Sequence, residues 1–462
     1  MYFSITATAV ASLLLTTASG APGSVKNDDH IEGRGLVGGL VGGLEGIFGN
    51  VEGLLEGVTN ASGILQVLEN IEPKATPADV SQASSTLQAI YSTTSASFWV
   101  EVGAQIEAGV VSSDLVGSVD NQDSGENSQV NTNSREPESA VYPRKAEGDA
   151  PYSLSEEQLR QVIYIPDDFT YGDKPPTIFV PGTGSYGGNT FGSNLRKLLT
   201  GADYADPVWL NIPGAMLMDA QVNAEYVAYA INYISGISQN SNVSVVSWSQ
   251  GGLDTQWAFT FWPSTRSVVS DFLPVSPDFH GTANAYLLCL NTNDTPGLLS
   301  CVPSVLQQQY DSDYVTTLRA KGGASAYVPT TTFYSSFFDE IVQPQAGTGA
   351  SAYLLDQRDV GVSNNEVQDV CAGHTGASFY GHAGVLYNPL TYALIVDALT
   401  HDGPGDASRL ESIADACGSY AAPGLDLTDV LETAGLIASA ALTILAYPDK
   451  LSTEPPLMSY AT

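Results

Sequence analysis

Short apolar runs alternate with helical patterns over the last two thirds of the chain. Residues 222–234 carry apolar side chains at the three- and four-residue spacing of a helix. β-branched and aromatic runs, which are typical of buried strands, occur at Thr177–Val180, Val243–Ser247, Phe272–Ser276 and Thr330–Tyr334. Strands that alternate with helices predict an α/β fold over residues 151–462, with a mostly parallel sheet flanked by helices.

A different pattern occupies residues 21–117. Apolar residues recur with helical spacing from Val37 to Val58, while the opposite face is mostly glycine. Each glycine costs a helix about 1 kcal/mol relative to alanine, so such a helix needs a partner surface or a lipid interface. A second helical pattern follows near Pro77–Tyr91. We interpret this region as a helical extension, either a propeptide or cover that shields the main domain or a small subdomain without catalytic consequence.

Residues 118–150 are rich in Ser, Asn, Asp, Glu and Gly and have almost no apolar content. This composition predicts a flexible linker between the extension and the main domain. The linker contains Arg144-Lys145, a basic pair of the kind that processing proteases cut.

The first twenty residues have the pattern of a signal peptide. An apolar run from Ala9 to Leu15 is followed by the small residues Ala18-Ser19-Gly20-Ala21. The run is too short to span a membrane. We therefore expect residues 1–20 to be removed and the protein to be secreted to the extracellular space.

Four cysteines fit an oxidising compartment and two disulfides, which allow three connectivities. We favour the pairs that are near in sequence, Cys289 with Cys301 and Cys371 with Cys417. Glycosylation triplets begin at Asn60, Asn242 and Asn293, as in a secreted glycoprotein.

The charge balance is strongly acidic. Sixteen Lys and Arg stand against 50 Asp and Glu, a formal net charge of −34. This excludes nucleic acid as a partner, because phosphate binding needs a basic surface. A negative field also helps to expel an anionic product such as a carboxylate, although it serves equally well to keep a secreted protein soluble.

A candidate nucleophile lies between a predicted strand and a predicted helix. Ser247-Trp248-Ser249-Gln250-Gly251-Gly252 follows the β-branched run and precedes the helical segment Leu253–Phe261. This is the setting of a nucleophile elbow, a sharp turn that lifts a serine hydroxyl above the sheet. Ser247 stands where the usual pattern has glycine, but serine is small enough for strand and helix to pass.

A serine nucleophile needs a base and an acid. Among five histidines, His382 lies between small residues in a late loop, and His374 is its chief rival. The acid is expected after a late strand, where Asp339 and Glu340 both fit on spacing alone.

Several segments resemble, in chain order, those of the Candida antarctica lipase B-like family of fungal lipases in the α/β-hydrolase superfamily. They are Val180-Pro181-Gly182-Thr183-Gly184, Trp248-Ser249-Gln250-Gly251-Gly252, Pro277-Asp278 with Gly281-Thr282, Asp339-Glu340-Ile341-Val342-Gln343-Pro344-Gln345 and His382-Ala383-Gly384. The similarity runs from about Pro175 to Tyr460. The extension has no counterpart in the mature named lipase.

The resemblance implies a function for individual residues. Ser249, Asp339 and His382 would be the catalytic triad, and Thr183 and Gln250 the oxyanion hole. Asp278 and Gln308 would orient the acyl side of the substrate. The alcohol side would be lined by Trp248, Ile437, Ala440, Ala441 and Ile444. The pair Cys371–Cys417 matches a family disulfide, whereas Cys289 and Cys301 are not expected from the family.

We therefore expect a lipase that cleaves acylglycerol esters through an acyl-enzyme, without metal or organic cofactor. The expected partner is a lipid or ester substrate at a lipid–water interface. We expect a monomer without a transmembrane span, since the apolar run 434–446 is too short. Alternatives are a carboxylesterase or transacylase for small soluble esters, a non-catalytic lipid-binding protein, and a latent zymogen whose extension blocks the entrance.

Overall fold

The computed structural model describes residues 46–58, 61–93, 98–111, 125–285, 290–291 and 299–462. The predicted signal peptide, Asn60, Asn293 and Cys289 lie outside the described residues. Asn242 lies within them and is exposed.

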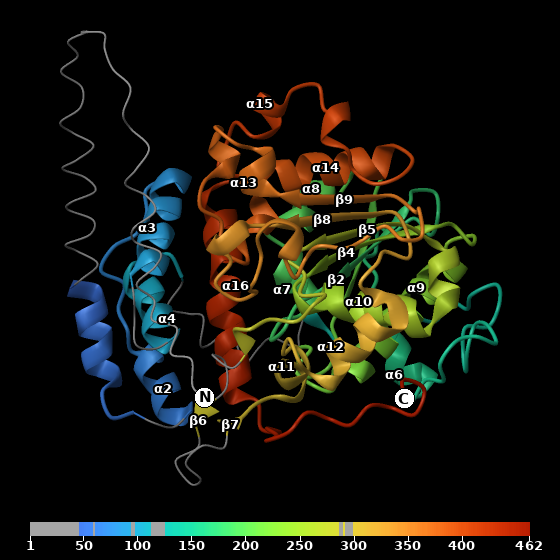
Figure 1. Ribbon diagram of the computed structural model, residues 1–462, viewed down its shortest axis with the longest axis horizontal. Coiled ribbons are helices and arrows are strands. Elements are labelled where there is room, and N and C mark those ends of the chain that lie inside the picture. Colours follow the sequence, from blue (N-terminus) through green and yellow to red (C-terminus); the bar gives the residue numbers. More distant parts are fainter. Residues whose placement is uncertain (1–45, 59–60, 94–97, 112–124, 286–289, 292–298) are drawn as a thin grey trace. The chain divides into compact units, whose positions relative to one another are not determined.

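A seven-stranded sheet forms the centre of the fold (Figure 1). The strand order is β1-β3-β2-β4-β5-β8-β9. Strand β1 runs antiparallel to β3, and the other neighbouring pairs are parallel. The strands are β1 (Ile163–Tyr164), β2 (Pro176–Val180), β3 (Asp206–Leu210), β4 (Val243–Trp248), β5 (Val269–Val275), β8 (Thr330–Tyr334) and β9 (Val362–Glu366), with a separate pair β6 (Leu290–Asn291) and β7 (Leu299–Ser300). The predicted α/β-hydrolase architecture, a mostly parallel sheet flanked by helices, is confirmed.

The described helices over 46–55, 80–92, 220–237 and 250–261 match helical patterns of the sequence, whereas the other helices were not predicted individually. The α-helices are a segment over 46–55, α2 (Ala61–Glu69), α3 (Val80–Ser92), α4 (Phe98–Glu107), α6 (Glu156–Gln161), α7 (Gly187–Phe191), α8 (Leu195–Leu199), α9 (Ala220–Ile237), α10 (Gln250–Phe261), α11 (Pro303–Gln307), α12 (Asp313–Leu318), α13 (Val367–Val370), α14 (Pro389–Thr400), α15 (Ile413–Ala416) and α16 (Leu427–Ala446). Shorter helical turns are η2 (Gly125–Asn127), η3 (Pro263–Ser267), η5 (Arg319–Gly323), η6 (Ser336–Phe338), η7 (Gly347–Gly349), η8 (Thr375–Ala377), η9 (Gly384–Tyr387) and η10 (Ala407–Arg409). Side chains cap the N-termini of the longest helices: Asp219 accepts from the N–H of Gln221 and Asp426 from that of Asp429.

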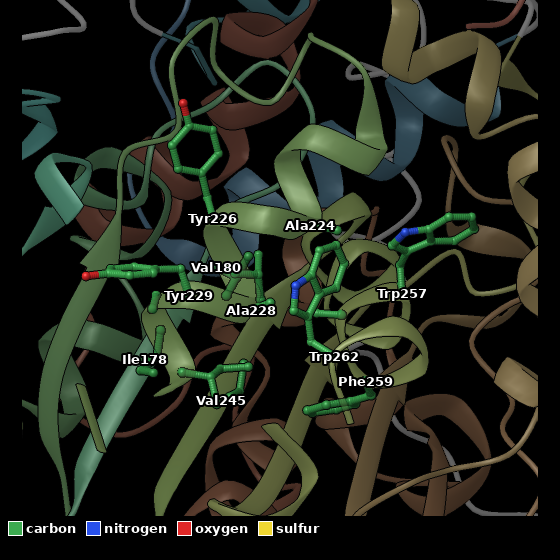
Figure 2. Packing of buried hydrophobic residues seen from close by; sticks show 14 of the residues in the cluster. Ile178, Val180, Ala224, Tyr226, Ala228, Tyr229, Val245, Trp257, Phe259 and Trp262 are labelled. Carbon is green, nitrogen blue, oxygen red and sulfur yellow. The ribbon is translucent and has the colours of Figure 1, made fainter. Parts of the chain in front are cut away.

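The two faces of the sheet carry separate hydrophobic clusters. Successive residues of a strand point to opposite faces, so Ile178 and Val180 of β2 join the cluster that contains α9 and α10. Phe179 joins the cluster that contains α8, α14 and α16. Figure 2 shows part of the first cluster, including Trp257 and Phe259 of α10. Helices thus cover both faces of the sheet, which leaves the ends of the strands as the place for a functional site.

Helix α16 is the one described helix that is long and apolar enough to cross a membrane. Its most apolar window is 78% buried inside the protein, as in the core helix of a globular domain. Its residues Val430 and Leu436 belong to the second cluster. The length and composition of α16 are therefore explained by packing within the protein.

The N-terminal helices pack on one another and on α16 (Figure 1). Phe48 and Val51 of the first helical segment are buried, whereas Gly46, Gly49 and Gly53 have open space where a Cβ would lie. The predicted apolar face is thus the packed face of this segment, and the glycine face is not. Helices α2 and α3 both contact α16.

Residues 125–150, which we call the belt segment, differ from the expected flexible linker. Their backbone and side chains are bonded to the main domain although they contain only one helical turn, η2. The carbonyl of Glu126 accepts from Trp209 Nε1 at 2.6 Å, and its carboxylate pairs with Arg196. Val141 is fully buried in the first cluster. The composition did not predict this order, because polar groups hold the belt segment by hydrogen bonds to the backbone of other elements. Residues 118–124 lie outside the described residues.

The predicted disulfide between Cys371 and Cys417 is present, and it joins α13 to the end of α15. Because Cys289 lies outside the described residues, its pairing with Cys301 stays a prediction.

We expect Val141→Ala to lower the free energy of unfolding by about 2 kcal/mol, because it removes buried methyl groups and leaves a cavity. The measurement is urea-induced unfolding, with Val130→Ala as the matched control. Val130 lies in the same segment but is 76% exposed, so its loss should change stability by less than ~0.5 kcal/mol. Equal, small effects would contradict the packing of the belt segment.

Candidate active site

Ser249 occupies the sharp turn between β4 and α10. Its backbone has φ 53° and ψ −130°, a region that non-glycine residues rarely adopt. The turn lies very close to the end of β2: a Cβ on Gly251 would lie 2.4 Å from the Pro181 carbonyl oxygen. A Cβ on Gly182 would lie 2.9 Å from the Ser249 Cβ. Glycine at both positions lets the loops meet, and the geometry is that of a nucleophile elbow.

Ser247 takes the position where the usual motif has glycine. It is fully buried, and its Oγ lies 3.4 Å from where a Gly252 Cβ would be. That is ordinary contact, so the serine fits beneath the helix. A Gly252 Cβ would instead collide with Pro277 at 2.7 Å. Gly251 takes the second glycine position of the motif, and its close approach to Pro181 leaves no room for a side chain there.

His382 and Asp339 form a buried pair. His382 Nδ1 lies 2.8 Å from Asp339 Oδ2 and 3.0 Å from Oδ1. Asp339 Oδ1 also accepts the backbone N–H groups of Ile341 and Val342, at 3.0 and 2.7 Å. These donors fix the direction of the carboxylate. The other imidazole nitrogen, Nε2, is buried without a hydrogen-bond partner in the described part of the chain.

The surroundings of His382 favour its protonated form. Burial alone would lower the pKa of His382, but the charge and hydrogen bond of Asp339, with the charges of Glu340 and Asp278, raise the pKa above its usual value. Its carbonyl accepts from Trp248 Nε1 at 3.3 Å and from Ser276 Oγ at 3.0 Å. The imidazole is therefore held in one place and poised to accept a proton.

The competing candidates are placed differently. His374 is exposed and does not line the pocket around Ser249. Glu340 lies beside Asp339, but it bonds to the backbone of His382 and not to the ring: its Oε2 accepts the His382 N–H at 2.8 Å. Of the two carboxylates, Asp339 alone holds the imidazole.

A mostly apolar pocket opens over Ser249 and His382. Other sequence-predicted residues that line it are Thr183, Trp248, Gln308, Ile437, Ala440, Ala441 and Ile444. Glu340, the other candidate for the acid, also lines it. Residues that line it and were not predicted are Phe98, Thr282, Asn284, Ala285, Val305 and Ile341. Val305 precedes Gln308 by three residues at the α11 turn, a spacing that signals a shared face. Phe98, from the N-terminal extension, has no such signal.

Thr183 and Gln250 meet at the edge of this pocket. Gln250 is the first residue of α10, where backbone N–H groups have no partner within the helix. The Thr183 hydroxyl lies 2.8 Å from Gln250 Oε1 and 3.1 Å from Gln308 Oε1. Gln250 Nε2 donates to the Met216 carbonyl and to Asp254, at 3.0 and 3.1 Å. This network brings together three predicted residues and holds them rigidly.

Asp278 is fully buried, and neither carboxyl oxygen has a hydrogen-bond partner among the described residues. Burial raises its pKa to about 7, against the opposing charge of His382. It does not itself line the pocket. An unpartnered buried carboxyl group costs free energy and is typical of a functional site. In the described part of the chain no cluster of three His, Cys, Asp or Glu is arranged to hold a metal ion.

Comparison with known proteins gives the family. The chain is 38% identical to Lipase B of Pseudozyma antarctica over 289 residues, which are 62% of this chain and 79% of that protein. The chain belongs to the lipase B family. As a member of this family it is a carboxylic ester hydrolase. No protein-family model matches the chain.

A solved structure of the same family is also similar. The crystal structure of Aspergillus fumigatus lipase B is 47% identical, with a TM-score of 0.80. The match covers 91% of this lipase B family member and all of the other chain. That share is larger than residues 151–462 alone, so the similarity extends into the region before the hydrolase domain.

We expect Asp339→Asn to lower the pKa of His382, because burial would then act without the strongest opposing charge. The measurement is NMR titration of the histidine rings, with the His382 signal assigned by its loss in His382→Gln. Asp356→Asn, which removes a carboxylate that does not shift His382, should leave the signal in place. An unchanged titration in Asp339→Asn would contradict the pairing.

Proposed function

We propose that this lipase B family member is a secreted serine hydrolase that cleaves acylglycerol esters through Ser249, His382 and Asp339. One observation carries the proposal: Ser249 and His382 line the same apolar pocket, and Asp339 is bonded to the far side of the imidazole. The similarity to two lipases supports it.

In the first step His382 Nε2 takes the proton of the Ser249 hydroxyl as the oxygen attacks the ester carbonyl. Asp339 holds the imidazole in the tautomer that leaves Nε2 free to accept, and it stabilises the imidazolium that results. His382 then gives the proton to the departing alcohol. Water attacks the acyl-enzyme in the same way, and the carboxylic acid leaves while Ser249 regains its proton.

The tetrahedral oxyanion of each step needs donors that are already in place. We assign the backbone N–H groups of Thr183 and Gln250, together with the Thr183 hydroxyl. The N-terminus of α10 adds a favourable dipole next to Ser249. Loss of one of these donors would cost ~10²–10³ in rate. Gln308 lines the pocket and would orient the acyl side of the ester, and Asp278, which is buried outside the pocket lining, would support that side from behind.

The pocket lining fits a lipid substrate. Ile437, Ala440, Ala441 and Ile444 lie on one side of α16 and face the pocket together with Trp248. Such a wall offers apolar contact and no charge, which suits an alcohol or acyl chain. The polar groups concentrate where the ester bond would lie.

Secretion is part of the proposal. The signal-peptide pattern of residues 1–20, the disulfide between Cys371 and Cys417, and the exposed Asn242 in a glycosylation triplet all suit an oxidising, extracytoplasmic route.

We expect Ser249→Ala to lower the hydrolysis of p-nitrophenyl esters by ~10⁶-fold, since no other group can form the acyl-enzyme. The measurement compares short- and long-chain esters. A preference for long chains in emulsion indicates a lipase, and a preference for short soluble chains indicates the carboxylesterase or transacylase alternative.

The matched control is Ser247→Ala, which removes a neighbouring buried serine that the proposal leaves out of the chemistry. It should keep its activity. Substantial activity in Ser249→Ala would mean that another residue is the nucleophile. Inactivity of wild type and Ser247→Ala on every ester, both before and after the extension is cut off, would favour a non-catalytic role.

We also propose that the helical extension is a cover over the pocket. Phe98, the first residue of α4, lines the pocket beside Ser249 and His382. Val80 and Phe98 pack against the second hydrophobic cluster, and α2 and α3 contact α16. A bulky substrate would therefore meet Phe98 on its way to Ser249.

If the extension covers the entrance, cutting the chain before the belt segment should raise the rate on long-chain triacylglycerol several-fold. A protease site placed within 118–124 leaves the contacts of Glu126 intact. The measurement is turnover before and after cleavage, with release of the extension followed by gel filtration.

Wild-type protein treated with the same protease is the control. Phe98→Ala in the uncut chain should give part of the same gain, because it removes only the side chain at the entrance. Release of the extension without any change in rate would contradict the cover.

A further inference from the structure

Glu340 is a carboxylate of the active site that the triad does not use. It follows Asp339 directly, is half-buried, and lines the pocket that contains Ser249 and His382. Its Oε2 accepts the backbone N–H of His382 at 2.8 Å. Its own carbonyl accepts from Asn284 Nδ2 at 3.3 Å. The side chain thus joins the loop of the acid to the loop of the base.

The contact between the two loops leaves little room for movement. A Cβ on Gly381 would lie 2.8 Å from Glu340 Oε2, so glycine lets the carboxylate reach the N–H of the next residue. His382 is held from the other side through its carbonyl, which accepts from Trp248 and Ser276. Glu340 is the acceptor that completes this clamp on the backbone of His382.

Glu340 also faces the N-terminal extension. Tyr91 of α3 lines a small cavity together with Glu340 and Gly381. The Tyr91 ring stacks on Phe379, with ring centroids 5.7 Å apart, and its hydroxyl accepts from Gln105 at 3.1 Å. Packing by α3 therefore shields one side of the carboxylate from water.

We propose that Glu340 is a positioning residue for the catalytic base, which holds the backbone of His382 and places a second negative charge beside the imidazole. The inference rests on the proposed role of His382 as the base. It differs from the role of Asp339, which touches the ring, because Glu340 acts through the main chain and through its charge.

The charged and titratable groups around Glu340 determine its ionisation. Asp339 and His382 lie on the two catalytic loops, Tyr387 on η9 and Tyr91 on α3, with Glu101 of α4 next to Tyr91. Burial, followed by the charge of Asp339, raises the pKa of Glu340 to about 7. Ionised Glu340 in turn raises the pKa of His382.

The charge of Glu340 affects how the activity depends on pH. The base must be unprotonated, so kcat/KM rises with pH through the pKa of His382 in the free enzyme. Glu340→Gln keeps an oxygen that accepts the His382 N–H and removes the charge. The pKa of His382 then falls, and the acidic limb of the profile moves to lower pH.

The test compares pH profiles of full-length wild type, Glu340→Gln and Glu340→Ala on one soluble p-nitrophenyl ester. Glu340→Gln should show the shifted limb and a kcat at high pH within about threefold of wild type. Glu340→Ala also lacks the charge, so its limb should shift in the same way. Its kcat at high pH should fall about 10-fold with little change in KM, below the ~10²-fold that a 1 Å misplacement can cost. Rescue by glutamine at high pH separates positioning from charge.

Glu366→Gln is the matched control. Glu366 also accepts a backbone N–H, that of Gly347 at 2.7 Å, but it is not among the groups that shift His382. Its profile should match wild type. An unshifted limb in Glu340→Gln would overturn the charge effect, and equal kcat values of Glu340→Ala and Glu340→Gln at high pH would overturn the positioning.

A wrong assignment of the triad would give a different result from a wrong assignment of Glu340. If His382→Gln keeps its activity on the same ester, His382 is not the base and the proposed triad is wrong. If His382→Gln is inactive while both Glu340 variants behave as wild type, the triad stands and the inference about Glu340 falls.

Discussion

The close approach of the β4–α10 turn to the end of β2 is the constraint on which the active site depends. A side chain at Gly182 or Gly251 would enter the space of Ser249 or of the β2 backbone. With glycine there, the strained turn at Ser249 and the loop of Thr183 share one small volume. The parallel order of the sheet then brings the loops after β5 and β8 to the same edge, which places Asp278 and Asp339 nearby.

Buried carboxyl groups are concentrated around one imidazole. Asp339, Glu340 and Asp278 all act on His382, while burial raises the pKa of Glu340 and of Asp278 to about 7. Such an arrangement is unfavourable for folding unless each group is paired or neutral. Asp339 is bonded both to backbone donors and to the ring, whereas the raised pKa values of Glu340 and Asp278 narrow the range of pH over which these two are ionised. Repulsion among these like charges thus influences which of the carboxyl groups is ionised.

Local patterns predicted part of the sheet and the candidate nucleophile, whereas the choice of acid and base came from the family resemblance. The β-branched runs at 177–180, 243–247 and 330–334 became strands β2, β4 and β8, because each is short, apolar and bounded by turn residues. Ser249 was a candidate because its neighbours form a strand–turn–helix motif, while His374 and Glu340 stayed open beside His382 and Asp339 until the resemblance was considered. Glu340 was a candidate for the acid, and only the fold shows that it bonds to the backbone of His382 and not to its ring. Phe98 was not assigned to the site, because its place depends on packing between elements far apart in the sequence. The same reason hid the order of residues 125–150, whose polar composition resembles that of a linker.

The belt segment has a further effect at the margin of the sheet. Strand β1 is its outermost member and is only two residues long. Asn133 Nδ2 donates to the carbonyls of Arg160 and Ile163, each at 2.8 Å, and the Asn131 N–H donates to the Gln161 carbonyl. An open edge is a template on which another molecule can add a strand and begin to aggregate. The Ile163 carbonyl lies on β1 itself, and the other two carbonyls lie in α6 just before it. The segment that composition marks as a linker therefore occupies part of this edge, where an added strand would otherwise bond.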